Sequence, residues 1–274
     1  MGTKSYLSTA KSRIPGALSS APTAAELAFF NRAETRAWWD AKPDYGQHVN
    51  DRGFWTDRKN GFDLVPFGSL LPVYLETGGP DSQPVVQGRP SGATADALLT
   101  PSGNAVIATG DLCVWAVAKA GSNSAAPLFS LAGNNGGGVT VHLRPTDLVL
   151  ARTEADNLVY QTRITQTLED SVFHLVQFNY KHGSPGEMSI WADGALLSGG
   201  DPSNGKYTYT HTFPSARIAW FGEYDVTDGM SVNPARNLPI AMCGVATTHA
   251  PDNNAWQAAL KAMVVERYPS LVIA

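Results

Sequence analysis

Short apolar runs follow one another at regular intervals from about residue 106 onward, and turn residues separate them. Examples of these runs are "APLFSLAG", "GVTVHLRP", "VFHLVQFNYK" and "LPIAMCGVATTH". The segments between them include "GNNGGG", "KHGSPGE" and "GGDPSNGK", which are rich in the residues that turns require. This spacing predicts an all-β sandwich or barrel rather than a fold in which strands and helices alternate.

One hairpin is visible in the stretch "MSIWADGALL", residues 188–197. Ile190 and Ala192 alternate with polar or aromatic neighbours, which is the periodicity of a strand. Asp193 and Gly194 then provide the residue types that a type I′ turn needs, because both of its central positions have positive φ. We therefore predict two strands joined at this pair.

A short helix is predicted over about residues 23–38, near the start of the chain. Thr23 followed three positions later by Glu26 forms a capping box. The positions that follow at helical spacing are Leu27, Phe30 and either Ala33 or Ala37. We expect this face to be the buried one.

A second helix is predicted over about residues 252–268. Pro251 suits a helix start and Pro269 stops the helix. The apolar side chains that share one face are Trp256, Leu260, Met263, Val264 and Tyr268. Such a face is typical of a helix that packs on a sheet.

Residues 1–22 show no periodicity and are rich in Ser, Ala, Lys and Pro. We expect an extended N-terminal arm that is either disordered or laid along a partner. The arm lacks the continuous apolar core of a signal peptide. No stretch approaches the roughly 18 apolar residues of a membrane span, so we expect no membrane partner and synthesis in a cytoplasm.

The composition is that of a foldable globular chain, with 43% hydrophobic and 16% charged residues among 274. The formal net charge of −4 argues against nucleic acid as a partner, because phosphate binding needs a basic field.

Cys113 and Cys243 both lie in apolar, strand-like runs. We expect two buried thiols, with a disulfide as the alternative if their strands are neighbours.

Four segments, in their order along the chain, resemble laminin-G-like, concanavalin A-like jelly rolls of the kind found in tailed-phage virion proteins. The opening segments "AWWDAKPDYG" and "GFWTDRKNGFDLVP" contain the residues Trp39, Asp40, Ala41, Trp55, Asp57, Asn60 and Gly61. The hairpin around Asp193 and the final strands with the C-terminal helix are similar to the centre and end of these domains. Gln87-Gly88 departs from the aromatic-Asp-Gly segment that is usual there. The resemblance implies one jelly-roll domain over 23–274.

The same resemblance implies a non-enzymatic structural protein of a tailed-phage virion. Such a protein would be displayed on the capsid or tail exterior, as a decoration or fibre-type component, and anchored by residues 1–22 to a major capsid or tail protein. We also expect a homo-oligomer, because exposed sheet edges need protection and virion sites repeat by symmetry.

The alternative function is a carbohydrate-binding module that recognises a host surface polysaccharide. Tyr207, Tyr209 and His211 alternate along "KYTYTHTF" and would share one face of a strand, where aromatic rings can stack on sugars. The competing interpretation is that this face is ordinary sheet core.

A glycoside hydrolase is a further alternative, which we favour less than a solvated loop. Glu223 and Asp225 would point to one face of a strand, as a pair of catalytic carboxylates does, and Asp228 follows. We predict no catalytic residue and no cofactor. The resemblance leaves calcium as an alternative, with Asp111, Asp193 and Asp225 as the candidate ligands.

Overall fold

The computed structural model describes residues 22–43, 49–50, 53–67, 71–88, 97–101, 106–108, 110–121, 127–133, 138–144, 148–153, 159–164, 168, 171–183, 185–198, 206–209, 215–225, 229–231 and 237–274. The predicted arm of residues 1–22 lies outside these ranges apart from Pro22, so the arm stays a prediction.

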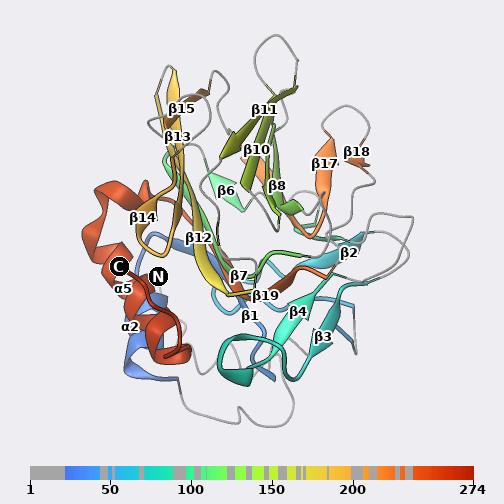
Figure 1. Cartoon of the computed structure of the whole chain (residues 1–274), viewed down its shortest axis with the longest axis vertical. Helices are drawn as coiled ribbons and strands as arrows, with labels where there is room; N and C mark the ends of the chain where they lie inside the picture. Colours follow the sequence, from blue (N-terminus) through green and yellow to red (C-terminus); the bar gives the residue numbers. More distant parts are fainter. Residues whose placement is uncertain are drawn as a thin grey trace.

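Two antiparallel sheets face each other and form a β-sandwich (Figure 1). The nine-stranded sheet contains β1 (Thr35–Asp40), β3 (Val73–Leu75), β4 (Val85–Gln87), β7 (Leu112–Ala118), β12 (His174–Lys181), β13 (Gly186–Ala192), β14 (Ala195–Leu196), β15 (Lys206–Tyr209) and β19 (Pro239–Ala246). The eight-stranded sheet contains β2 (Val65–Phe67), β5 (Ala97–Leu99), β6 (Ile107–Ala108), β8 (Pro127–Gly133), β9 (Gly138–Leu143), β10 (Leu148–Thr153), β11 (Val159–Ile164) and β16 (Ser215–Trp220). The all-β prediction is confirmed.

The order of strands is β14-β13-β12-β7-β19-β4-β3 in the nine-stranded sheet, and β1 and β15 pair with β19 and β13. The order in the other sheet is β11-β10-β9-β8-β16-β5-β2, with β6 beside β16. A small separate sheet is formed by β17 (Glu223–Asp225) and β18 (Gly229–Ser231).

The main core fills the space between the two sheets. Alternation along β7 places Val114 and Ala116 on this inner face, while Cys113 and Trp115 point to the outer face of the nine-stranded sheet. Across the core, the rings of Phe129 and Phe178 meet edge to face with their centroids 5.9 Å apart.

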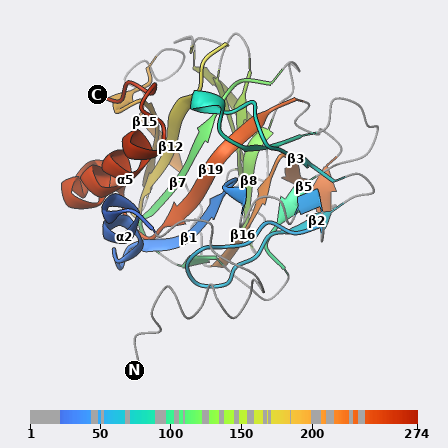
Figure 2. The same ribbon diagram turned by 90° about the horizontal axis from the view of Figure 1, so that it is seen from below.

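A second core lies on the outer face of the nine-stranded sheet, under the helices α2 (Ala24–Phe30) and α5 (Asn254–Arg267) (Figure 2). Phe29 of α2 is its centre. The ring centroid of Phe29 lies 5.5 Å from that of Trp38, 5.6 Å from that of Trp115 and 5.8 Å from that of Trp256. The two helices therefore hold one aromatic cluster against β1 and β7.

The capping box of the first helix is confirmed. The Thr23 hydroxyl accepts a hydrogen bond from the backbone N–H of Glu26, and the Glu26 carboxylate accepts one from the backbone N–H of Thr23. The predicted extent and face are wrong. The helix ends at Phe30, where Lys59 Nζ donates to the Phe30 carbonyl oxygen, and Leu27 is exposed while Phe29 is buried. Residues 35–38, predicted as helix, belong to β1 instead.

The reason for this error is that Trp38 and Trp39 are both apolar and both buried. In an extended strand, Trp38 points to the helical layer and Trp39 to the main core, so pairing with β19 buries both rings. Neighbouring residues of a helix cannot both be buried in this way on one face.

The second predicted helix is confirmed as α5, preceded by a 3₁₀ turn, η2 (Ala250–Asp252).

The hairpin predicted at Asp193-Gly194 is also confirmed. The two residues have φ of 50° and 86°, as a type I′ turn requires, and they join β13 to β14. The Asp193 carboxylate accepts from the Leu175 backbone N–H at 2.8 Å and lies 2.6 Å from His174 Nδ1. Asp193 therefore ties the turn to β12.

Both cysteines are free and buried, as expected. Their strands are neighbours, but Cys113 points to the outer core and Cys243 to the inner core. Side chains on opposite faces of a sheet cannot form a disulfide. Burial raises the pKa of both thiols.

The residues of the opening motif meet at one place, beside β1. The Asp57 carboxylate accepts backbone N–H groups of four residues: Trp38, Lys59, Asn60 and Phe62. Burial raises the pKa of Asp57, and these four donors oppose that shift. Asp57 thus closes the loop of residues 57–62 against β1.

The next residue, Arg58, anchors a buried ion cluster that consists of Arg58, Asp40, Glu26 and Lys42. Arg58 Nη1 lies 2.8 Å from Asp40 Oδ2 and 3.2 Å from Glu26 Oε1, and Lys42 Nζ lies 3.8 Å from the same Glu26 oxygen. The guanidinium group also stacks over the Trp38 ring at 3.9 Å. The cluster therefore links α2 and β1 to Lys42, which follows β1, and to the loop of residues 57–62.

Candidate functional site

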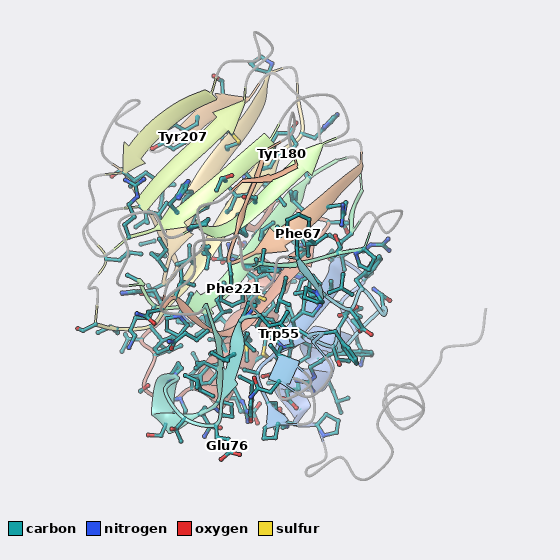
Figure 3. The ribbon with its side chains drawn as sticks, turned by 90° about the vertical axis from the view of Figure 1, so that its right-hand side faces the viewer. Trp55, Phe67, Glu76, Tyr180, Tyr207 and Phe221 are labelled. Atoms are coloured by element: carbon teal, nitrogen blue, oxygen red, sulfur yellow. The ribbon has the colours of Figure 1, made fainter. Side chains whose placement is uncertain are left out.

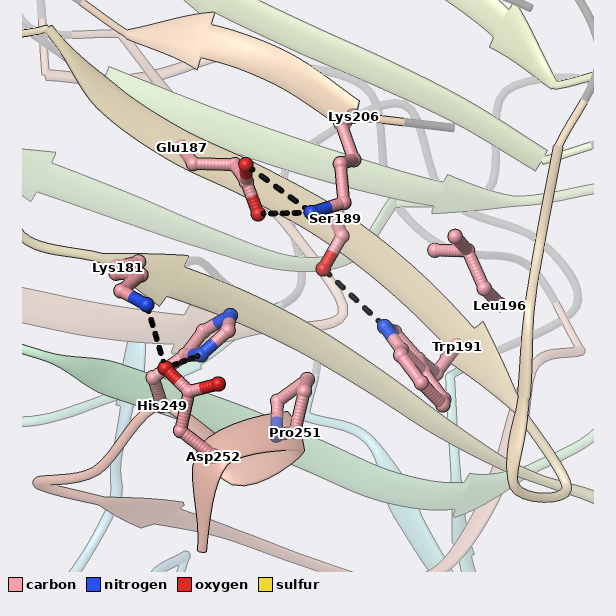
Figure 4. A pocket seen from close by; sticks show the side chains of 9 residues that line it. All are labelled: Lys181, Glu187, Ser189, Trp191, Leu196, Lys206, His249, Pro251 and Asp252. Atoms are coloured by element: carbon pink, nitrogen blue, oxygen red, sulfur yellow. Dashed lines mark hydrogen bonds and ion pairs between the residues drawn. The ribbon is translucent and has the colours of Figure 1, made fainter. Parts of the chain in front are cut away.

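A pocket lies on the outer face of the nine-stranded sheet, where the helices end and leave β13, β14 and β15 uncovered (Figure 4). Its volume is about 150 Å³. The residues that line it are Lys181, Glu187, Ser189, Trp191, Leu196, Lys206, His249, Pro251 and Asp252. Most of them are the outward-pointing residues of their strands, and the last three come from η2 and the residue before it.

Two half-exposed ion pairs form the charged side of the pocket. Lys181 Nζ lies 2.7 Å from Asp252 Oδ2, and Lys206 Nζ lies 3.0 Å from Glu187 Oε1. The hydrogen bond from Lys181 and that from His249 lower the pKa of Asp252. The hydrogen bond to Asp252 raises the pKa of Lys181. These two pairs are the pocket ion pairs.

The opposite side of the pocket is apolar. Trp191 and Leu196, which face each other across the hairpin, lie there together, and Pro251 lies to the left of Trp191 in the view of Figure 4. The Trp191 ring is partly exposed, and its Nε1 donates to Ser189 Oγ at 3.2 Å. This hydrogen bond fixes the orientation of the ring, so an aromatic surface is presented next to polar groups.

Two buried polar side chains lie at or beside the floor of the pocket. His249 is 5% exposed, and its Nδ1 lies 3.0 Å from Asp252 Oδ2. Within the described part of the chain, neither Nε2 of His249 nor the side-chain amide of Asn179 has a hydrogen-bond partner. Asn179 is fully buried and pairs across the strands with Ser189, a pocket residue. Buried polar groups are normally hydrogen-bonded to protein or to ordered water, so these two side chains have hydrogen-bonding capacity that the described residues do not use.

Tyr207, one of the three sugar-binding residues proposed from the sequence, does not line this pocket. Tyr207 is 1% exposed and belongs to the main core, so its ring cannot stack on a sugar; Figure 3 shows it at the same end of the sandwich as Tyr180. Lys206 and Thr208 are the exposed residues of β15. The side chain of Tyr209 and all of His211 lie outside the described residues.

The candidate catalytic carboxylates, Glu223 and Asp225, lie on β17. Their side chains and the whole of Asp228 are outside the part of the chain that the structure describes. Catalysis at these residues therefore stays a prediction.

Asp111 and Asp193, two of the three candidate calcium ligands, lie far apart. Asp111 accepts from the His182 backbone N–H at 2.8 Å, beyond one end of β12, whereas Asp193 binds Leu175 near the other end. Eight residues of strand separate those ends by roughly 25 Å. The side chain of Asp225 lies outside the described residues. Among the residues that are described, no group of three or more His, Cys, Asp or Glu side chains could hold a metal ion.

Sequence reasoning missed the pocket, although one signal was present. Trp191 occupies the same strand face as Glu187 and Ser189, which are polar, and a tryptophan at a polar position is a candidate for surface recognition. His249 and Asp252 lie about 60 residues further along the chain, and no pattern connects them to β13.

The sequence matches no protein-family model and no curated protein. Among solved structures, the binding domain of botulinum neurotoxin serotype G is similar with a TM-score of 0.50 and 9% identity, over 85% of this chain and 51% of that chain. Trypanosoma rangeli sialidase, in complex with 2,3-difluorosialic acid, is similar with a TM-score of 0.53 and 9% identity, over 96% of this chain and 38% of that one. Domains LG4-5 of the mouse laminin α1 chain follow with 14% identity and a TM-score of 0.42, over 66% of this chain and 44% of that chain.

This chain therefore spans about half or less of the length of those structures. At such low identity the likeness concerns the fold alone. None of the described helices is long and apolar enough to cross a membrane. Taken with the order of strands, the comparisons show an all-β sandwich of two antiparallel sheets.

Proposed function

We propose that this chain is a non-enzymatic carbohydrate-binding β-sandwich, and that it binds sugars in the outer-face pocket. The observation that carries the proposal is the partly exposed ring of Trp191 opposite His249, whose buried Nε2 has no partner within the described residues. A sugar ring has apolar C–H faces and a rim of hydroxyl groups. The pocket offers an aromatic wall for the first and hydrogen-bonding groups for the second.

The size of the pocket supports a small ligand. Its volume of about 150 Å³ is below the 300–1,000 Å³ range of sites for drug-sized molecules. One sugar ring, such as the end of a chain, matches this space better than several consecutive rings. The fold is compatible with a recognition role, since one similar structure is the binding domain of a neurotoxin.

The electrostatics of the pocket favour binding over hydrolysis. A glycosidase needs one carboxylic acid whose pKa is raised, so that it can protonate the leaving group. In the pocket, hydrogen bonds from Lys181 and His249 lower the pKa of Asp252 instead. The other carboxylate, that of Glu187, is held by Lys206. Asp252 therefore lacks the raised pKa of a general acid, and the Glu187 carboxylate is engaged by a lysine.

A glycan array probed with the full chain tests the proposal. We expect binding to a subset of glycans and a loss of at least about tenfold in affinity for Trp191→Ala, because aromatic anchors dominate small binding sites. The matched control is Thr208→Ala, which changes an exposed residue of the neighbouring strand β15 that does not line the pocket. An array without hits, or equal affinity for wild type and Trp191→Ala, would contradict the proposal.

A finer proposal concerns where the chain acts, namely on the exterior of a tailed-phage particle. Its support is the resemblance of the sequence to phage-associated jelly rolls and the unpatterned residues 1–22. Deletion of residues 2–22 should leave a folded sandwich that no longer enters particles. Normal incorporation of the truncated chain would contradict this role and leave the glycan proposal intact.

A further inference from the structure

We infer that the pocket selects neutral, polyhydroxylated sugar rings and discriminates against acidic ones. The inference rests on the proposed function, because it specifies the ligand class of the same site. It comes from the arrangement of charges around Trp191.

The formal charges that line the pocket cancel. Two lysines, Lys181 and Lys206, face two carboxylates, those of Asp252 and Glu187. Each lysine is already in contact with its carboxylate, at 2.7 Å and 3.0 Å. His249, the remaining titratable lining residue, has its Nδ1 directed to Asp252. The pocket therefore has no cation whose counter-charge must be supplied by the ligand.

An acidic sugar would meet a penalty at either pocket ion pair. To reach Lys181 or Lys206, its carboxylate must come close to Asp252 or Glu187, which repel it, or displace one of them from its lysine. Like charges brought together at a binding site are a common source of specificity. The half-exposed position of the pairs weakens this repulsion through solvent screening but leaves its sign unchanged.

A neutral hydroxyl group meets no such penalty. It can accept a hydrogen bond from a lysine ammonium and at the same time donate one to the adjacent carboxylate. An ammonium has three N–H donors and a carboxylate about four acceptor positions, so each pair can bind a hydroxyl without breaking its own contact. Adjacent hydroxyl groups of one ring would bridge a pocket ion pair in this way.

His249 fits the same ligand. Because Nδ1 donates to Asp252, a neutral imidazole presents a bare acceptor at Nε2. A hydroxyl group can donate to this nitrogen, whereas an ionised carboxylate has no proton to donate. The buried Nε2 is thus suited to a hydroxyl.

The test measures the affinity of the full chain, by isothermal titration calorimetry at neutral pH, for matched pairs of oligosaccharides. Each pair has the same linkage and differs only in its terminal ring, which is glucose or galactose in one member and the corresponding uronic acid in the other. We expect the acidic member to bind at least about tenfold more weakly.

Two variants examine the cause of the discrimination. Glu187→Gln removes one repelling carboxylate from beside Lys206, so the ratio of the neutral to the acidic affinity should fall severalfold. Lys206→Gln removes the cation and leaves the Glu187 carboxylate, so the ratio of the neutral to the acidic affinity should rise. Both residues are half-exposed, and unfolding midpoints close to that of the wild type confirm that the variants are folded.

The outcomes separate this inference from the proposed function. If the acidic members bind as tightly as the neutral ones, or if Glu187→Gln leaves the ratio unchanged, the selectivity is wrong while carbohydrate binding stands. If neither the neutral nor the acidic oligosaccharides bind, the selectivity and the proposed carbohydrate binding are both wrong.

Discussion

Two sets of ion pairs lie on the same face of the nine-stranded sheet, and they differ mainly in burial. The buried ion cluster around Arg58 lies at the helix-covered end, where the side chains of Arg58 and Asp40 are 1% and 0% exposed. The pocket ion pairs lie at the uncovered end, where the side chains of Lys181 and Asp252 are 52% and 54% exposed. The residue types and distances are similar, so the difference arises from the layer above them.

This difference determines what each set can do. A buried charge that loses its partner is costly, since water cannot replace the lost interaction. The buried cluster therefore suits a structural role, in which α2 is held to β1 and the loop after it. A half-exposed pair contributes little to stability, and its unused donors and acceptors remain available to a ligand. Breaking each set in turn tests this contrast.

The largest effect is expected for Arg58→Met. The substitution leaves the buried carboxylates of Asp40 and Glu26 without their main partner, so we expect a loss of about 3–5 kcal/mol in the free energy of unfolding. Urea unfolding at neutral pH, followed by tryptophan fluorescence, measures it. Lys181→Met is the matched control and should leave the free energy of unfolding close to that of the wild type, because exposed ion pairs contribute little to stability. Equal losses would refute the contrast.

Two tryptophans allow the same comparison for aromatic side chains. Trp256 is a fully buried residue of α5 and donates to Thr35 Oγ1 at 3.1 Å, so Trp256→Ala should cost about 3–5 kcal/mol of stability. Trp191→Ala should cost much less stability but reduce glycan affinity at least about tenfold. Chemical unfolding and calorimetric titration separate the two effects. A folded Trp256→Ala variant that had lost binding would argue against a local site.

The response to acid distinguishes the two sets in a third way. Burial opposes ionisation of Glu26, but Arg58 and Lys42 outweigh it and lower the pKa of Glu26 below its usual value of 4.5. The folded state then binds this proton more weakly than the unfolded state, so the stability from Glu26 is present above about pH 4.5 and is lost as pH falls through the folded pKa. Glu26→Gln should flatten the decline of stability in acid.

Salt provides the control for this experiment. Asp252 also has a lowered pKa, but it is half-exposed. At about 0.5 M salt, where the Debye length is only a few ångströms, the effect of Asp252→Asn on the acid decline should vanish and that of Glu26→Gln should persist. If salt removed both effects equally, the cluster would behave as a surface pair.

The smallest effect is expected for the pair Lys206–Glu187. A double-mutant cycle with Lys206→Gln and Glu187→Gln should give a coupling energy of about 0.2–1 kcal/mol in urea unfolding. A coupling of about 3 kcal/mol or more would mean that the pair serves stability, contrary to its proposed role in the pocket.

Features that depend on neighbours in the chain could be predicted from the sequence. The capping box of Thr23 and Glu26 and the turn at Asp193-Gly194 are local chemistry, and both are found in the structure. The C-terminal helix was predicted within two residues at each end, because its cap and its stop are local as well. The run of regularly spaced strands indicated the all-β class for the same reason.

Features that depend on which face is covered could not be predicted. A period of two shows that Tyr207 and Lys206 point in opposite directions, but not that Tyr207 points to the core. The helix prediction extended too far because Ala37 fits helical spacing, and only pairing with β19 decides that residues 35–40 are a strand.

The sequence by itself therefore determined the class of fold, the position of the hairpin and the start of both helices, since short-range interactions govern these features. Only the tertiary structure decided which charged side chains are buried and which remain exposed to solvent. The pocket combines β12 to β15 with residues 249–252, and its existence depends on where α2 and α5 stop covering the sheet. Burial is a property of contacts between distant segments, and it is burial that separates the cluster around Arg58 from the pocket ion pairs.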